Sequence, residues 1–165
     1  MELKQWVKKH KWYIFLLAFL VLVSYANSFG NGFVADDTGL VLHAPSWNFR
    51  TLFTNPFSSL RQLTYQIVYG IGGMNPFIFR LPNILFHLGT VLLIFFFLSR
   101  KTTLAVAIMS ASFFAVHPIL VESVTWISGG VYAQYSFFFL LSFVAYVFSG
   151  KQVKLYALSI ISFLL

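Results

Sequence analysis

Two adjacent aspartates, Asp36 and Asp37, are the residues of this sequence best suited to carry out chemistry. They follow the segment Asn-Gly-Phe-Val-Ala at residues 31–35. A carboxylate here can act as general base for a hydroxyl, bind a divalent cation, or cap the following helix. One aspartate would be enough for a cap, and adjacent like charges cost free energy unless a cation or a proton compensates. The pair therefore favours a functional role over capping.

A second candidate pair, His117 and Glu122, flanks the segment 118–121, which begins with Pro118. Ionisable groups at the edge of an apolar segment are usually functional, because burial without a partner is costly. The alternative is that both side chains satisfy backbone groups near the proline. Their spacing does not place two ligands on one helix face, and the sequence has no His-x-x-x-His motif. A metal site is therefore less supported.

Asn83 and His87 are four residues apart, so they share one face of a predicted helix. They either line a pocket or form hydrogen bonds between helices. Arg61 and Arg80 carry guanidinium groups, whose planar fork suits a phosphate. The alternative for the arginines is anchoring at a membrane surface with the charged head in water.

The composition identifies the solvent around these residues as a lipid bilayer. Apolar residues make up 59% of the chain, charged residues 9%, and the mean hydropathy is +0.81. No water-exposed surface of this size could carry that balance. The net charge is +7, and the basic residues fall in short clusters between apolar runs. This distribution is typical of residues that set the orientation of membrane helices rather than of a nucleic-acid-binding surface. The absence of cysteine excludes disulfides and thiolate sites.

A spanning helix needs about 20 apolar residues, so the chain has room for about five crossings. The expected fold class is an all-α integral membrane protein, a multi-pass helical bundle. The expected helices cover residues 12–28, 81–98, 103–116 and 131–148, with a fifth beginning near residue 155. Turn-forming residues predict a long first external loop over 29–80 with short interfacial helices, and a second over 117–130. Because the chain ends inside an apolar run, residues 1–165 are expected to be the N-terminal part of a larger transmembrane domain.

The positive-inside rule places the N-terminus in the cytoplasm. The cytoplasmic cations are then Lys4, Lys8, Lys9, Lys11, Arg100, Lys101, Lys151 and Lys154, and the external ones are Arg50, Arg61 and Arg80. Asp36, Asp37 and Glu122 fall in the external loops, and only Glu2 stays inside. A cleaved signal peptide would share the basic N-terminus, but the apolar run of residues 12–26 is long for one, so a retained first helix is expected.

Four motifs occur in a fixed order along residues 28–129. They are Ser28-Phe29-x-Asn31-Gly32-Phe33-Val34-x-Asp36-Asp37, Gly73-Met74-Asn75-Pro76-Phe77, Leu81-x-Asn83-x-Leu85-x-His87, and Phe114-Ala115-Val116-His117-Pro118-x-x-x-Glu122-x-Val124-x-Trp126-Ile127-Ser128-Gly129. The ordered set resembles the N-terminal part of GT-C superfamily membrane glycosyltransferases. It is most similar to the transmembrane and TPR-repeat protein O-mannosyltransferases and their bacterial relatives.

The resemblance implies that a loop carboxylate deprotonates an acceptor hydroxyl, which attacks a sugar, such as mannose, carried on a polyprenyl or dolichyl phosphate. On this chain the expected base is Asp37, with Asp36 supporting it. His117 and Glu122 match the family's His-Pro-x-x-x-Glu and would hold the donor phosphate or a divalent cation, whose ligands would be Asp36 and Glu122. The other supporting candidates are Arg61, Arg80, His87 and Asn83.

The implied partners are the lipid-linked sugar, an acceptor protein or glycan, and the bilayer itself. The implied location is the endoplasmic reticulum in a eukaryote or the plasma membrane in a bacterium. Two segments depart from the family pattern. Residues 61–63 read Arg-Gln-Leu instead of Arg-Pro-Leu, and residues 130–134 read Gly-Val-Tyr-Ala-Gln where the family has an arginine followed by an acid.

Two other functions are compatible with the sequence. A lipid-linked oligosaccharide flippase or other transporter would also place polar groups between helices, but near the bilayer midplane. The acids of this chain gather instead in loops at one face, which favours chemistry on a lipid-borne donor. A non-catalytic assembly subunit is the third interpretation, and the missing arginine after Gly129 keeps it open.

Overall fold

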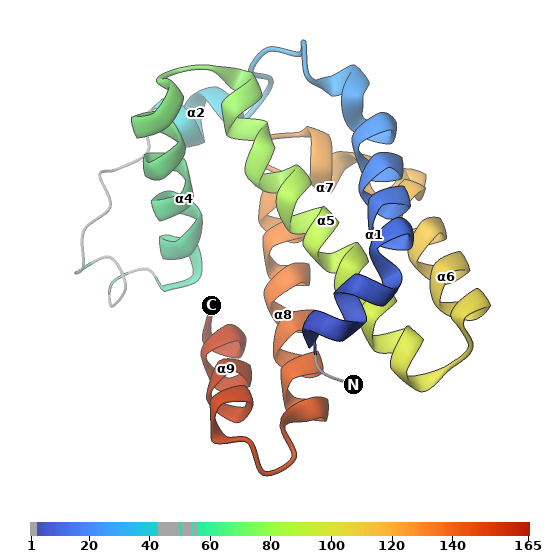
Figure 1. Cartoon of the computed structure of the whole chain (residues 1–165). Helices are drawn as coiled ribbons and strands as arrows, with labels where there is room; N and C mark the ends of the chain where they lie inside the picture. The colour runs from blue at the N-terminus through green and yellow to red at the C-terminus, as the bar shows by residue number, and fades with distance from the viewer. Residues whose placement is uncertain (1–2, 43–49, 51–53, 55) are drawn as a thin grey trace.

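The computed structural model describes residues 3–42, 50, 54 and 56–165 of the chain, and Figure 1 shows their arrangement. The regular elements are α1 (Leu3–Tyr25), η1 (Ala26–Ser28), α2 (Asp37–Leu42), α4 (Pro56–Gly72), α5 (Pro76–Lys101), α6 (Leu104–Val116), η2 (Pro118–Leu120), α7 (Val121–Thr125), α8 (Gly130–Ser149) and α9 (Val153–Leu164). Every regular element in this part of the chain is a helix, which confirms the predicted all-α class.

Three helical segments are long and apolar enough to cross a membrane. They are Leu3–Ser28, α5 and α8. A fourth span arises if α6 and the segment Pro118–Thr125, which are bent by 48° at their junction, are counted together. Helix α9 is apolar but has only 12 residues. The multi-pass character is confirmed, and the expected number of about five spans is approximate.

Two helices begin earlier than the apolar pattern predicted. Helix α1 starts at Leu3 rather than at residue 12, because lysines are good helix formers and continue the helix beyond its apolar part. Helix α5 starts at Pro76 rather than at residue 81. The side chain of Asn75 accepts a hydrogen bond from the Phe77 amide at 3.0 Å, and proline fits the first helical position. Arg80 is consequently part of α5.

The core forms around α5, which packs against α1, α6 and α8 (Figure 1). Helix α6 contributes a face of small residues, Ala107, Ala111 and Ala115, all of them fully buried. Small side chains at this spacing let two helix backbones approach closely, which is a common way for helices to associate in membranes. Leu17 and Val21 of α1 belong to the same buried cluster.

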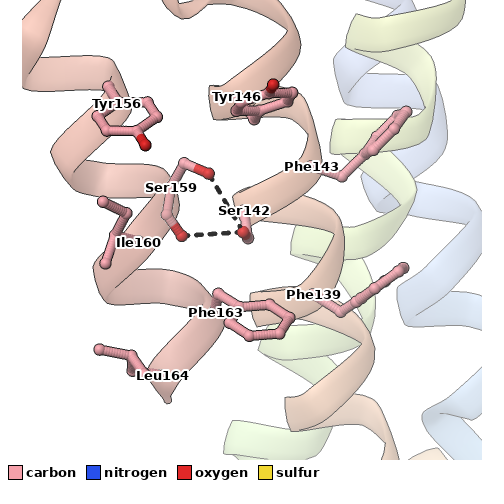
Figure 2. Close-up of a pocket in the computed structure, with 9 residues that line it drawn as sticks. All are labelled: Phe139, Ser142, Phe143, Tyr146, Tyr156, Ser159, Ile160, Phe163 and Leu164. Atoms are coloured by element: carbon pink, nitrogen blue, oxygen red, sulfur yellow. Dashed lines mark hydrogen bonds between the residues drawn. The ribbon is translucent and has the colours of Figure 1, made fainter.

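Helix α9 packs on α8 through a contact between two serines (Figure 2). The Ser142 hydroxyl donates to the Ser159 carbonyl at 2.8 Å, and the two hydroxyl oxygens are 3.3 Å apart. A groove of about 370 Å³ runs beside this contact between rings that include Phe139, Phe163 and Tyr156. Its lining contains no carboxylate, histidine, lysine or arginine, so this groove does not locate the candidate chemistry.

Candidate functional site

The two segments predicted as external loops meet at one end of the bundle. Helices α2, α4 and α7 and the first turns of α5 come together there (Figure 1). A separate buried cluster holds them. Its members are Val41, Tyr65, Val68, Phe79 and Ile127. These apolar contacts place the polar residues of the two segments beside one another.

Asp37, the first residue of α2, lies at the centre of this junction with its side chain 0% exposed. One carboxylate oxygen accepts from the backbone amide of Ser128 at 2.9 Å and from its hydroxyl at 2.6 Å. The other oxygen accepts from the Val34 amide at 3.0 Å. Charge-assisted bonds of this kind are the stronger hydrogen bonds in proteins. Asp37 therefore joins the first loop segment to the second.

Asp36 is exposed, although it is the immediate neighbour of Asp37. No hydrogen bond or ion pair joins its side chain to any other residue that the structure describes. The preceding residue, Ala35, has a φ of 47°, a left-handed conformation that is uncommon outside glycine. The structure thus separates the two aspartates into a buried carboxylate that is already bonded and a free carboxylate at the surface.

Arg80 is 1% exposed and donates to backbone carbonyls on both loop segments. Nε donates to Thr125 at 2.6 Å, Nη1 to Asn31 at 3.0 Å, and Nη2 to Gly32 at 3.1 Å. A longer bond of 3.5 Å reaches Pro76 in the same helix. This arrangement, which we call the Arg80 clamp, fixes the positions of the loop backbones and favours a structural role for this arginine.

Arg61 of α4 is bonded differently, although it is also buried at 6% exposure. Its Nη2 donates to the Asn83 side-chain oxygen at 3.0 Å and to the Ile127 carbonyl, and its guanidinium lies 4.5 Å from the centre of the Tyr65 ring. Nε and Nη1 are buried without a hydrogen-bond partner among the described residues. Burial lowers the pKa of Arg61, and the nearby Tyr65 and Asp37 oppose that shift. An anion reaching the two unpaired groups would be strongly favoured.

Asn83 links α5 to the second loop segment. Its amide nitrogen donates to the Trp126 carbonyl at 3.0 Å, while its oxygen accepts from Arg61. Gly130 lies directly against it, since a Cβ at that position would come within 1.8 Å of the Asn83 oxygen. Asn83 and Gly130 therefore form one tightly packed contact between α5 and α8.

His87 lies one turn further along α5 and bonds to a neighbouring helix. Its Nε2 is 3.1 Å from the Ala115 carbonyl of α6, and its ring packs against Phe114 and Tyr25. This contact is the interhelical hydrogen bond that was one of the two predicted alternatives.

His117 and Glu122 occupy the bend between α6 and α7. Nδ1 of His117 accepts from the Ile119 amide at 3.3 Å and so caps η2. Glu122 is exposed. Within the described part of the chain, no hydrogen bond joins these two residues to each other or to Asp36. The structure brings together Asp37, Arg61, Arg80 and Asn83, whereas His117, Glu122 and Asp36 lie outside that hydrogen-bonded network.

Ser128 supplies two of the three donors to Asp37, a role that was not predicted for it. Its position in the Trp-Ile-Ser-Gly motif was the available signal. Among the described residues there is no group of three or more His, Cys, Asp or Glu side chains able to hold a metal ion. A phosphate oxygen of a bound lipid would be a suitable further ligand for a divalent cation at Asp36 or Glu122.

Comparison with known proteins gives one consistent result. The chain is 32% identical over 156 residues to Protein O-mannosyl-transferase TMTC3 of Homo sapiens, which covers 81% of the chain and 16% of that protein. It is 31% identical over 156 residues to human TMTC1, which covers 79% of the chain and 17% of that protein. It is 29% identical over 168 residues to human TMTC4, which covers 82% of the chain and 23% of that protein.

The chain thus spans less than a quarter of the length of these relatives. No protein-family model matches it, and no solved structure does. Over about 80% of its length, this membrane chain is similar to the curated protein O-mannosyl-transferases, which confirms the resemblance that its ordered motifs predicted.

Proposed function

We propose that the chain is part of an integral-membrane glycosyltransferase that transfers a sugar from a polyprenyl- or dolichyl-phosphate donor to an acceptor hydroxyl. The observation that carries the proposal is the junction itself. It combines a free surface carboxylate, Asp36, with Asp37 fixed by Ser128 and with the two unpaired buried groups of Arg61. The names of the relatives support mannose as the sugar and a protein as the acceptor.

In the proposed reaction the acceptor hydroxyl gives its proton to a carboxylate, and its oxygen forms a bond to the anomeric carbon. The bond from that carbon to the phosphate oxygen breaks, and its electron pair leaves with the lipid phosphate. The exposure of Asp36 supports this residue as the base, which reverses the order predicted from the sequence. Asp37 would then act by fixing the backbone next to the base.

The leaving phosphate needs cationic stabilisation more than protonation, because it departs as an anion. The unpaired Nε and Nη1 of Arg61 support this arginine as the phosphate ligand, whereas the carbonyl bonds of Arg80 support a positioning role. Glu122, which is exposed on the second loop segment, remains the proposed partner of Asp36 if a divalent cation assists.

The proposed sidedness follows from charge. Helices α2 and α7 lie at the junction end of the bundle, whereas the end of α5 and the connection from α8 to α9 lie at the other end (Figure 1). Asp37 and Glu122 belong to the first two helices and Asp36 directly precedes α2, while α5 ends in Arg100 and Lys101 and the connection contains Lys151. The positive-inside rule then assigns the junction, and with it the predicted external loops 29–80 and 117–130, to the non-cytoplasmic face. In a eukaryotic cell this would be the lumenal side of the endoplasmic reticulum.

The test is transfer of radiolabelled mannose from a polyprenyl-phosphate donor in membranes that carry the full-length protein. Asp36→Asn should lower transfer by about 100-fold or more without changing the thermal stability. Arg61→Gln should raise the donor concentration needed for half-maximal rate by about tenfold or more, since hydrogen bonds to charged groups are lost.

Two controls make the assignment specific. Lys154→Gln removes an exposed charge at the opposite end and should leave transfer unchanged. If Asp37→Asn abolishes transfer at unchanged thermal stability while Asp36→Asn does not, Asp37 is the base. If transfer is absent from the wild type with a panel of lipid-linked sugars, or indifferent to both aspartates, the protein is a transporter or an assembly subunit instead.

A further inference from the structure

A second cavity lies at the opposite end of the bundle from the aspartates. Helices α1, α5, α8 and α9 enclose it, and its volume is about 510 Å³. The walls are almost entirely apolar and include Trp6, Leu92, Phe148 and Leu158. This volume falls in the range of about 300–1,000 Å³ that is typical of small-molecule pockets. We call it the basal groove.

One cation, Arg100, is part of the lining of the basal groove. Its guanidinium carbon lies 5.7 Å from the centres of the Phe96 and Phe148 rings, which hold it in place by cation–π contacts. Arg100 is half-buried, and within the described part of the chain its guanidinium has no hydrogen bond or ion pair. It differs in this respect from Arg61 and Arg80, which both donate to protein oxygens.

The surroundings of Arg100 are positively charged. Lys101 is the next residue, and its ammonium lies 5.6 Å from the Phe148 ring. Lys4 follows Leu3 and Lys151 precedes Gln152, and both Leu3 and Gln152 line the groove. The acidic residues that the structure describes lie at the junction end or on α7, so none of them compensates this charge.

We propose that the basal groove binds one anionic phospholipid from the surrounding leaflet, with its phosphate on Arg100 and an acyl chain along the apolar walls of the groove. The groove and an anionic phospholipid match in two respects, a cation for the phosphate and apolar walls for the acyl chain. A guanidinium forms paired hydrogen bonds to phosphate oxygens, and it lies here at the last turn of a spanning helix, where lipid headgroups are found. A soluble anion could satisfy Arg100 but would leave the apolar walls unfilled.

The net negative charge of an anionic lipid would also be attracted by Lys101, whose ammonium lies against the Phe148 wall of the groove. A zwitterionic lipid carries a compensating cation on its headgroup and therefore gains less from this cluster. The site is consequently expected to select lipids by headgroup charge rather than by chain length.

The test is native mass spectrometry of the full-length protein, purified with equal amounts of phosphatidylglycerol and phosphatidylcholine of identical acyl chains. We expect one bound phosphatidylglycerol per chain, favoured at least fivefold over phosphatidylcholine. Arg100→Gln should remove the preference. Leu158→Trp, which fills the groove from a half-exposed wall position, should lower the bound lipid of both kinds.

Lys154→Gln is the matched control, because it removes a positive charge at the same end from a residue that does not line the groove. It should preserve the fivefold preference. Equal retention of the two lipids by the wild type would overturn the proposal, and so would a preference that survives Arg100→Gln. Retention of a second copy of the chain in place of lipid would show that the groove is an interface between copies.

Discussion

Asp36 and Asp37 are chemically identical neighbours, yet their surroundings suit one to bind a substrate and the other to stabilise the fold. The carboxylate of Asp37 is buried and accepts from three donors, two of them on Ser128. The carboxylate of Asp36 is exposed and available to an incoming hydroxyl. A substitution at each position should therefore change a different property of the protein.

Asp37→Asn is expected to lower the free energy of unfolding by about 1–3 kcal/mol, because its new amide group would face the Val34 amide with one donor against another. Asp36→Asn should leave it unchanged. The measurement is thermal unfolding of both variants in the same detergent. Equal stability of the two variants would show that the contact between Asp37 and the Val34 amide does not stabilise the junction.

Gly130→Ala should also destabilise the protein, by about 1–3 kcal/mol, since its Cβ would overlap the locked Asn83 side chain. Gly70→Ala is the control. No atom lies within 4 Å of a Cβ at Gly70, which is exposed in α4, so alanine should stabilise that helix slightly. Thermal unfolding that ranks the two variants in the opposite order would contradict the packing described for Asn83.

At the scale of elements, α6 depends on its row of small side chains. Ala107, Ala111 and Ala115 are fully buried, and they allow α6 to approach α5 and α1 closely. Other residues of α6, among them Met109 and Phe113, remain exposed on the surface of the bundle. The helix is thus nearly uniform in hydrophobicity but strongly asymmetric in side-chain size.

Ala111→Leu is expected to destabilise the bundle by about 1–3 kcal/mol through overpacking. Ala105→Leu adds the same atoms at an exposed position of α6 and should have little effect. Both variants are compared by thermal unfolding in detergent. A similar loss for both would indicate that helix propensity, rather than the contact with α5, governs the stability of α6.

The elements were largely predictable from hydrophobicity, but their ends were not. Apolar runs identify the part of a helix that lies in lipid, and they gave α6 and α8 nearly at their observed bounds. They missed the basic start of α1 and the capped start of α5, because helix ends are set by caps and propensity. The Asn75-Pro76 pair begins α5, although the prediction placed both residues in the external loop over 29–80.

At the scale of the whole molecule, the acidic residues that the structure describes lie at the junction end, and a cluster of basic residues lies at the opposite end. This distribution predicts which end faces the cytoplasm. Because the chain has no cysteine, single-cysteine variants can test that orientation directly. In sealed vesicles whose non-cytoplasmic face is turned outward, a membrane-impermeant maleimide should label Gly30→Cys at the junction end and leave Thr102→Cys unlabelled until the membrane is permeabilised. Both positions are exposed in the structure. Labelling in the reverse order would place the N-terminus outside.

The site was less predictable than the fold, because its contacts join distant parts of the chain. Asp37 and Ser128 are 91 residues apart in sequence, and Arg80 reaches carbonyls 45 to 49 residues away on either side. The motifs and residue types pointed to Asp37 and Arg80 as candidates, although not to Ser128. They carried no information on which aspartate is buried or which arginine keeps unpaired N–H groups, since that depends on how the two loop segments fit together.

The Arg80 clamp has a consequence for how the protein tolerates variation. Its acceptors are peptide carbonyls, which every amino acid provides, so the clamp demands nothing of the side chains at Asn31, Gly32 and Thr125. In a saturation-mutagenesis library scored for surviving folded protein, position 80 would accept almost no replacement, while its three partners would accept many. The clamp therefore tolerates substitutions at the residues that supply its carbonyls, but not at Arg80 itself.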